Sequence, residues 1–194
     1  MTFQHKFDPT SLREYDIRGI VGKTLSGDDA FAIGRCFGTI VKREGGSVVA
    51  VGYDGRLSST MLEEALVKGL MACGLKVLRV GCCPTPMLYY GAYELKADGG
   101  VMVTGSHNPP DYNGFKIVIA GDTLANEQIQ ALRLRIENND LASGTGSVER
   151  VDVLERYYNE IRDDIAVAKK LKVVVDCGNG VAGVIAPQLI EGLG

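Results

Sequence analysis

The sequence contains no tryptophan and only two histidines, and aromatic residues make up 7% of its 194 residues. It has no apolar run that approaches the roughly 18 residues needed to span a bilayer. Its first residues, MTFQHKFDPT, lack the apolar core of a secretion signal. The net charge of −3 offers no basic field that would favour nucleic acid. These absences predict a cytoplasmic protein that binds neither nucleic acid nor a membrane.

Five cysteines are present, but their arrangement predicts neither disulfides nor a zinc site. No C-x-x-C pair occurs, and Cys82 and Cys83 are adjacent, which makes a bond between them awkward. Cys36 and Cys73 lie in apolar helical patterns, where cysteine acts as a small core residue. An odd number of cysteines also argues against a secreted, disulfide-rich scaffold.

Short apolar runs alternate with longer helical patterns, which is typical of an α/β fold whose mixed, mostly parallel sheet lies between helices. The run GGVMVTG is apolar on both faces, so we expect it near the centre of that sheet. Ser26 with Asp29, and Thr60 with Glu63, have capping-box spacing and predict two helix starts. The expected strands cover residues 15–22, 47–52, 76–81, 99–105 and 115–119, and the expected helices cover about 26–44, 59–73, 87–95 and 125–138.

The segment 138–148 is rich in Asn, Ser and Gly and is the best candidate for a linker. We therefore expect a complete first domain over residues 1–147 and the beginning of a second α/β domain over 148–194. The second part offers a helix at 152–166, a strand at 171–176 and a helix at about 181–192. A single strand–helix pair cannot bury its own apolar faces, so we expect this second domain to be incomplete and the chain to be a fragment.

The loop in VMVTGSHNPPDYNGFKIVI, residues 101–119, has the composition of a reactive site. It leaves one expected strand and returns to the next, which brings Ser106 and Lys116 to the same end of the sheet, where ligands of α/β folds bind. A serine oxygen can carry a phosphoryl group, a lysine can neutralise phosphate charge, and the imidazole of His107 can move a proton near neutral pH. The alternative is an ordinary surface turn in which Asn108 and Asn113 are turn residues.

The whole loop TGSHNPPDYNGFK resembles the phosphoserine loop of the α-D-phosphohexomutases, in the form found in the phosphomannomutase/phosphoglucomutase branch, and YDIRGIVG near the N-terminus matches the same branch. The resemblance implies interconversion of hexose 1-phosphate and hexose 6-phosphate, with mannose or glucose as the sugar, through a hexose 1,6-bisphosphate intermediate that also acts as activator. It implies no oligomeric state.

Carried over residue by residue, the resemblance makes Ser106 the phosphorylated serine, with His107, Asn108 and Lys116 lining its pocket. Lys116 and Arg18 would neutralise phosphate charge and assist proton transfer, and Tyr15 would lie near the substrate. Mg²⁺ would be held partly by the phosphate on Ser106. The family's aspartate-rich D-G-D-G-D-R metal loop does not occur in this sequence, so we expect the chain alone to be inactive.

Two alternatives remain beside this hypothesis. Gly178, Gly180 and Gly183 form G-x-G-x-x-G after an expected strand, the pattern of a dinucleotide-binding turn, although a tight turn without a ligand explains it better. A non-catalytic fragment that binds sugar phosphates is the other alternative. Two further expectations concern the surroundings: Asp54 and Arg56 pair and brace the neighbouring serine loop, and His5 lies solvated in a mobile tail.

Overall fold

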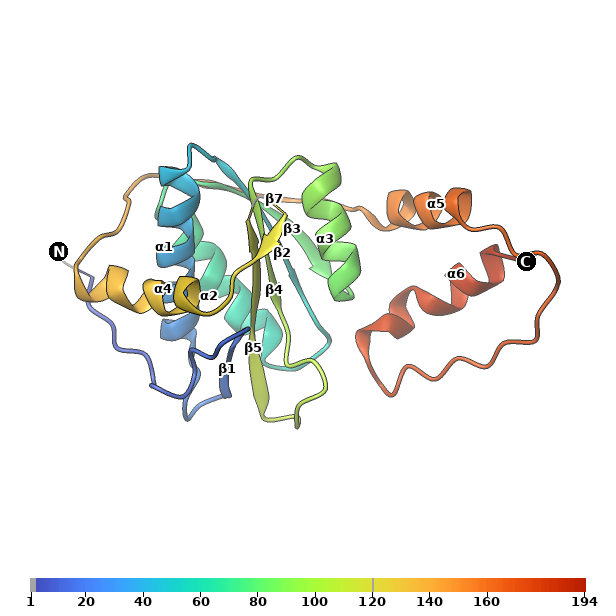
Figure 1. Ribbon diagram of the computed structural model, residues 1–194, viewed down its shortest axis with the longest axis horizontal. Coiled ribbons are helices and arrows are strands. Elements are labelled where there is room, and N and C mark those ends of the chain that lie inside the picture. The colour runs from blue at the N-terminus through green and yellow to red at the C-terminus, as the bar shows by residue number, and fades with distance from the viewer. Residues whose placement is uncertain (1–2, 120) are drawn as a thin grey trace.

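The computed structural model describes residues 3–119 and 121–194, and a mixed sheet lies between helices at its centre (Figure 1). The sheet has the order β1-β5-β4-β2-β3-β7, with β6 paired to β5. β2, β3, β4 and β7 run parallel, whereas β5 is antiparallel to β1, β4 and β6. The expected α/β fold is confirmed. The strands are β1 (Ile17–Ile20), β2 (Val48–Tyr53), β3 (Lys76–Cys82), β4 (Gly99–Val103), β5 (Tyr112–Ile119), β6 (Asp122–Thr123) and β7 (Ser147–Arg150).

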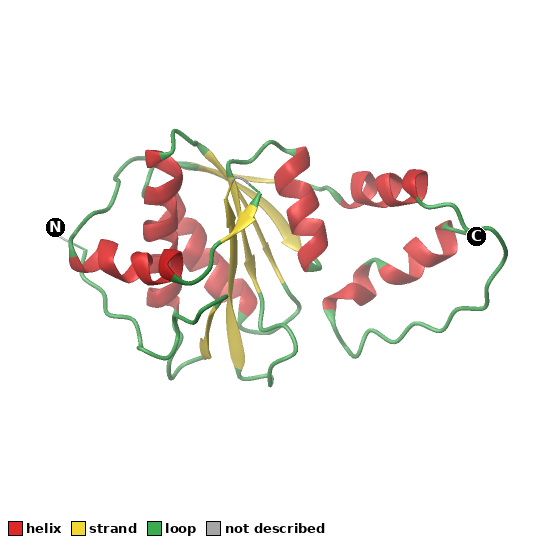
Figure 2. Ribbon diagram, viewed as in Figure 1, coloured by secondary structure: helices red, strands yellow, loops and turns green. Residues whose placement is uncertain are grey.

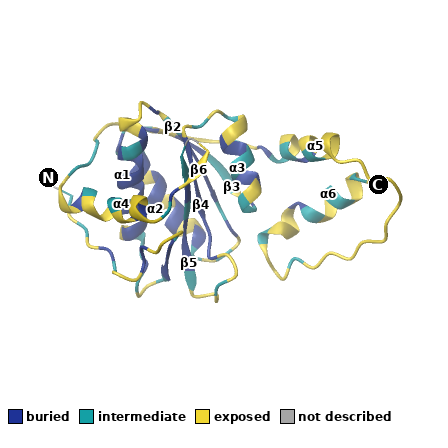
Figure 3. Cartoon of the chain, viewed as in Figure 1, coloured by how far each residue is buried: buried dark blue, intermediate teal, exposed yellow. Residues whose placement is uncertain are grey.

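Helices cover both faces of the sheet: α1, α2 and α4 lie on one face and α3 on the other, with α5 against α3 (Figure 1). Each face has its own apolar cluster, and the larger one lies under α1, α2 and α4. Figure 3 shows that burial is concentrated in the sheet and in the helix faces turned toward it. The helices are α1 (Gly27–Arg43), α2 (Ser59–Met71), α3 (Thr85–Glu94), α4 (Glu127–Glu137), α5 (Leu154–Asp164), η1 (Val181–Val184) and α6 (Ala186–Gly192).

The start of α1 is held by the predicted capping box. The Ser26 hydroxyl accepts the Asp29 backbone N–H, and the Asp29 carboxylate accepts the Ser26 N–H at 2.8 Å. The expectation of a solvated His5 is wrong, because Nε2 of His5 lies 2.8 Å from the same carboxylate, and the two side chains are 14% and 10% exposed. The His5 ring also packs edge-on against Phe7. These contacts fasten the N-terminal segment to α1.

The predicted capping box at Thr60 is wrong, because α2 begins at Ser59 and Glu63 is used elsewhere. The Glu63 side chain is fully buried and makes a two-pronged ion pair with Arg79 of β3, in which Nε lies 2.7 Å from Oε1. Burial raises the pKa of Glu63, and the neighbouring Arg79 offsets only part of that rise. A buried carboxylate needs such a partner, and this one ties α2 to the sheet.

The segment expected to be a linker adds a strand to the sheet. β7 pairs in parallel with β3, with Ser147 opposite Lys76 and Arg150 opposite Arg79, so it crosses the expected boundary at residue 147. Beyond it, Val153 is fully buried in the cluster under α3. The chain therefore stays packed on the sheet and α3 beyond residue 147, and Ile185, after η1, joins the same cluster.

The expected strand at 171–176 is wrong: this segment has no strand partner among the described residues and forms the long loop between α5 and η1 (Figure 2). Val173, Val174 and Val175 are 50%, 90% and 45% exposed. The expected helix at 181–192 is interrupted, since η1 ends at Val184 and α6 begins at Ala186. None of the described helices is long and apolar enough to cross a bilayer.

Candidate functional site

The loop that carries Ser106 connects the end of β4 to the start of β5 at one end of the sheet (Figure 1). Ser106 has a backbone φ of +52°, a left-handed conformation that is uncommon for residues with a side chain. Its backbone N–H donates to the Thr104 hydroxyl at 2.9 Å, and its own Oγ is exposed and lies 3.4 Å from Nδ1 of His107. The loop therefore presents the serine hydroxyl to solvent with an imidazole beside it.

Asp54, just after β2, supports this loop from beneath. One oxygen of its buried carboxylate accepts the Thr104 hydroxyl at 2.8 Å and the Gly105 N–H at 3.0 Å. The other accepts the Ser59 hydroxyl at 2.6 Å and the Arg56 N–H at 3.1 Å. The predicted pairing of Asp54 with Arg56 is also present, at 3.5 Å from Arg56 Nε. The turn after β2 and the serine loop thus share one hydrogen-bonded carboxylate.

Arg56 also holds the loop by its backbone. Its guanidinium donates to four carbonyl oxygens of the loop, those of Ser106 (3.0 Å), Asn108 (2.6 Å), Pro109 (2.6 Å) and Tyr112 (3.0 Å). The expectation that this residue braces the serine loop is confirmed by these contacts.

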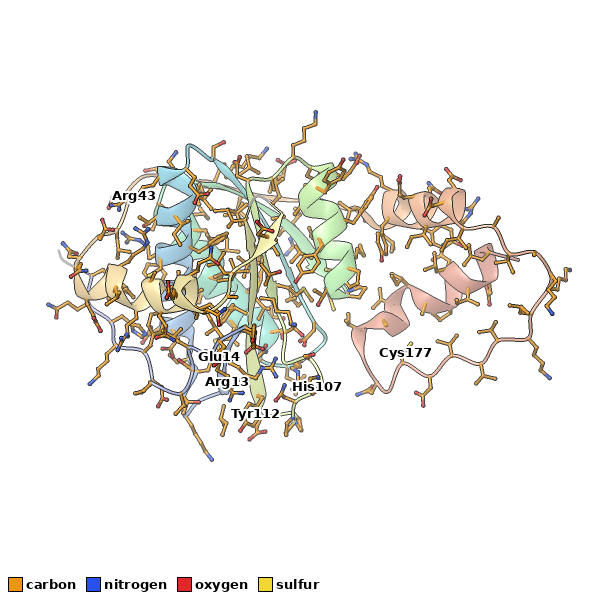
Figure 4. All side chains as sticks on the ribbon, viewed as in Figure 1. Arg13, Glu14, Arg43, His107, Tyr112 and Cys177 are labelled. Carbon is orange, nitrogen blue, oxygen red and sulfur yellow. The ribbon has the colours of Figure 1, made fainter. Side chains whose placement is uncertain are left out.

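Arg18 and Lys116, two of the three cationic residues of one cleft, lie there with Ser106. Arg18 of β1 lies opposite Gly114 of β5, and Lys116 is two residues further along β5, so their side chains share one face of the sheet. Gly114 has no side chain to separate them. The cleft measures about 530 Å³ and is lined by Arg13, Glu14, Tyr15, Asp16, Arg18, Ser106, His107 and Lys116. Figure 4 shows Arg13, Glu14 and His107 at the same end of the sheet.

Arg18 has a donor without a partner. Its Nη2 donates to the Asp16 carboxylate, but its buried Nε has no hydrogen-bond partner among the described residues. That nitrogen is itself out of reach of solvent, so the attraction of an oxygen-rich anion to this cleft comes from the positive charges of Arg13, Arg18 and Lys116. The geometry suits a phosphate group better than a neutral ligand.

A second cleft lies on the other side of the loop. It has a volume of about 830 Å³ and runs from Ser106, His107 and Asn108 to the turn at 178–182. Gly178 and Asn179 in that turn have φ values of +54° and +63°. The turn lacks a preceding strand, and a short 3₁₀ helix follows it, so the strand–turn–helix context that the dinucleotide hypothesis requires is not formed.

The predicted site residues divide between these clefts. Ser106 and His107 border both, Lys116, Arg18 and Tyr15 line only the smaller one, and Asn108 lines only the larger one. The Asn108 side chain donates to the Gly105 carbonyl at 3.0 Å, so it helps to close the turn of the loop. The Tyr15 side chain stands at the rim, where the residue is 69% exposed.

Asn113 is a part of this region that the sequence did not indicate. β5 starts at Tyr112, earlier than expected, so Asn113 lies within the strand and is fully buried. Its Nδ2 donates to the hydroxyls of Ser58 and Ser59 at 2.8 and 2.9 Å, and its Oδ1 accepts the Gly114 N–H. These bonds fix the start of α2 to β5. Asparagine followed by glycine is a turn signal, and no feature of the sequence marks it as buried.

The described residues do not form a magnesium site by themselves. No group of three or more His, Cys, Asp or Glu side chains is arranged to hold a metal in the described part of the chain. The carboxylate of Asp54 already accepts hydrogen bonds from the loop, and the smaller cleft holds three cations beside the carboxylates of Glu14 and Asp16. A hard divalent cation needs several oxygen ligands, which this surface does not supply.

Comparison with known proteins agrees with this geometry. The family model of the phosphoglucomutase/phosphomannomutase α/β/α domain I matches residues 9–143. A phosphomannomutase/phosphoglucomutase of Pseudomonas aeruginosa is 66% identical over 187 residues, which are 96% of this chain and 40% of the relative. A phosphoglucomutase of Neisseria meningitidis is 46% identical over 185 residues, again 40% of its length.

The solved structure of a phosphoglucomutase/phosphomannomutase family protein from Burkholderia thailandensis superimposes with a TM-score of 0.93 at 45% identity, over 97% of this chain and 43% of that one. The chain thus spans about 40% of the length of the curated relatives named above. The loop with Ser106 and the strand with Arg18 both fall within the matched domain. This chain belongs to the phosphoglucomutase/phosphomannomutase family.

Proposed function

We propose that this chain carries the phosphoserine of a phosphohexomutase, which interconverts hexose 1-phosphate and hexose 6-phosphate through a hexose 1,6-bisphosphate. The observation that supports this most strongly is the cleft that brings together an exposed serine, a histidine and the cationic side chains of Arg13, Arg18 and Lys116. Phosphoryl transfer depends on positioning and on neutralising charge, and these residues provide both.

Ser106 Oγ is the phosphoryl carrier. When phosphoserine reacts, a bond forms between phosphorus and the free sugar hydroxyl, the bond from phosphorus to Oγ breaks, and the hydroxyl proton leaves to a base. The His107 imidazole, 3.4 Å from Oγ, is placed to return a proton to that oxygen. In the return step the other phosphoryl group moves to Oγ, which gives up its proton. The bond from that phosphorus to the sugar oxygen breaks, the sugar oxygen takes up a proton, and the isomer leaves.

Lys116 and Arg18 hold the phosphate oxygens during both steps. A lysine acts as a point charge, whereas the planar guanidinium of Arg18 fixes the orientation of the phosphate. Asp16 accepts from Nη2 and keeps the guanidinium in place. Tyr15 at the rim and Asn108 in the loop contact the sugar phosphate on opposite sides of the serine.

Mg²⁺ would contact this chain only through the phosphoryl group on Ser106, and it would supply further neutralisation of phosphate charge. The residues that complete the coordination of Mg²⁺, and those that select mannose or glucose, are not among the residues of this chain. We therefore expect this chain alone to show no turnover. We also expect it to be a protein of the cytoplasm. Robust mutase activity of the purified chain with Mg²⁺ and a hexose bisphosphate would refute that expectation.

A chimera tests the function directly. The 187 matched residues of the Pseudomonas aeruginosa relative are replaced by those of this chain, and phosphoglucomutase and phosphomannomutase activities are measured. We expect an active chimera, loss of activity with Ser106→Ala, and a phosphoryl group on Ser106 in mass spectra of the active form. Lys116→Met removes the lysine of the cleft from the chimera. Lys68→Met, at an exposed position of α2, is its matched control.

The non-catalytic alternative gives a different result in the same experiment. A fragment that only binds sugar phosphates would yield a folded chimera that binds hexose 1,6-bisphosphate, turns over neither substrate and acquires no phosphoryl group. Such a chimera would overturn the proposal.

A further inference from the structure

The guanidinium of Arg56 is used up by the serine loop. A guanidinium has five N–H donors in a fixed planar arrangement. Nη1 donates to the carbonyls of Pro109 and Tyr112, and Nη2 donates to those of Ser106 and Asn108, at 2.6 to 3.0 Å. The fifth, on Nε, faces the Asp54 carboxylate at 3.5 Å. No donor is left for a ligand.

We propose that Arg56 is the positioning residue that holds Ser106 in its exposed, left-handed conformation, and that it is not a ligand of the phosphoryl group. The proposal rests on the function proposed above and extends it to a residue beneath the reacting loop. The carbonyls of Ser106 and Asn108, and those of Pro109 and Tyr112, all accept hydrogen bonds from this one side chain. The loop therefore cannot change its conformation without breaking several charge-assisted hydrogen bonds.

The neighbouring glycine fits this role. A Cβ atom added at Gly105 would lie 2.2 Å from Arg56 Nε and 2.3 Å from Cζ. The guanidinium therefore lies directly against the backbone that leads into Ser106, and only glycine leaves it that space. At the same time Asp54 receives the Gly105 N–H, so the loop is held from both its donor and its acceptor groups.

The charge of Arg56 is balanced by a partner, which distinguishes it from the cations that line the smaller cleft. Asp54 balances Arg56 beneath the loop, so this pair adds no net charge to the site. Lys116 and Arg18 line the other cleft, together with Arg13. The loop thus has one arginine for its shape and a different arginine and lysine for the anion.

The test compares the full chain with its Arg56→Lys, Gly105→Ala and Lys116→Met variants by NMR. Amide exchange is followed at Gly105, Ser106, Asn108 and Tyr112, whose N–H groups are all hydrogen-bonded within the loop region. The amides of β2 and β4 report on the stability of the whole sheet. Titration with hexose 1,6-bisphosphate follows the chemical shifts of Ser106 and His107 and gives the affinity.

Arg56→Lys keeps the positive charge but loses the planar set of donors, and Gly105→Ala keeps Arg56 but displaces it. We expect both to speed exchange of the loop amides by about tenfold or more, with β2 and β4 unchanged, and to weaken bisphosphate binding by about tenfold. Lys116→Met should weaken binding to a similar extent and leave loop exchange unchanged. Because Gly105→Ala acts without altering any charge, agreement between the first two variants identifies geometry as the cause.

Wild-type loop protection in Arg56→Lys would overturn the proposal, and so would faster exchange that is equal in the loop, β2 and β4, since Arg56 would then serve only general stability. Retained loop protection together with weakened binding would make Arg56 a direct phosphate ligand. If the wild-type chain alone binds no bisphosphate, the chimera still decides the proposed function, and the exchange comparison alone still decides the role of Arg56.

Discussion

The buried ion pair between Glu63 and Arg79 gives the sharpest prediction about the fold that supports the site. Arg79→Met removes the charge but keeps a side chain of similar length. It leaves a carboxylate that is 0% exposed without its only ion-pair partner in the described part of the chain. Breaking a buried pair on one side typically costs about 3–5 kcal/mol. Since the Arg79 side chain is itself 21% exposed, water screens the pair in part, and we expect about 3 kcal/mol at pH 7.

The cost should depend on pH, and its sign follows from the pKa of Glu63. Burial already raises this pKa, and removing Arg79 removes an influence that lowers it, so the pKa rises further. A carboxyl whose pKa is higher in the folded than in the unfolded state favours folding at low pH, and this contribution is lost as the pH rises through the folded-state pKa. The deficit of Arg79→Met should therefore be greatest at pH 7 and shrink toward pH 5, by at most about 1.4 kcal/mol per pH unit.

Urea unfolding at pH 5, 6 and 7, followed by circular dichroism, measures this dependence. The double variant Glu63→Gln with Arg79→Met is the control, because a neutral amide removes the unpaired charge and should recover most of the loss. Two results would refute the reasoning: an equal deficit at pH 5 and pH 7, or a double variant as unstable as Arg79→Met alone.

Three further predictions concern the N-terminal segment, the sheet edge and the thiols. His5→Ala should cost about 1 kcal/mol at pH 7 in urea unfolding, because it removes a partly buried hydrogen bond to Asp29. Burial raises the pKa of Asp29, but the hydrogen bonds from His5 and Ser26 outweigh this and hold the pKa below its ordinary value. The stability lost in His5→Ala should therefore shrink as the pH drops through the pKa of Asp29, and a loss that does not change with pH would contradict this dependence. Gly114→Ala would place a Cβ 2.1 Å from the Ile17 carbonyl oxygen, so it should displace β1. We expect the free energy of unfolding to fall by about 2 kcal/mol or more and phosphate binding in titrations to weaken. A normal free energy of unfolding together with normal binding would count against this contact. Burial raises the pKa of Cys83 to about 12 and raises that of the exposed Cys82 less, so iodoacetamide at pH 8 should label Cys82 before Cys83 in peptide mass spectra. Equal labelling of the two would disprove the buried state of Cys83.

The sequence predicted elements whose signals are local. The capping box at Ser26 and the apolar period behind it define α1 without any help from the rest of the fold. The place of Ser106 could be inferred because a loop between neighbouring strands returns to the same end of the sheet, which also puts Lys116 there. The geometry that prepares the serine, namely φ of +52° and the four bonds from Arg56, depends on a turn fifty residues away and has no local signal.

The errors have a common physical cause: a local stretch does not show whether a distant segment will supply it with contacts. LKVVVD has strong strand propensity, but a strand also needs a neighbour to receive its hydrogen bonds, and none of the described residues provides one. Asn113 looks like a turn residue until the hydroxyls of Ser58 and Ser59 make it a buried strand residue. Likewise Glu63 has capping spacing, yet an ion pair with β3 gives it a better partner than a helix end.

The alternation of side chains along β5 has a consequence for how this protein tolerates change. Phe115 and Ile117 point into the hydrophobic interior, and Lys116 between them enters the cleft beside Ser106. The packing of Phe115 and Ile117 therefore also restrains the position of the Lys116 amine. If Phe115 is replaced by a smaller residue and the backbone shifts to fill the space, the charge of Lys116 moves as well. Repacking under α1 and substrate affinity should thus vary together among engineered or natural variants, although the two regions share no atoms.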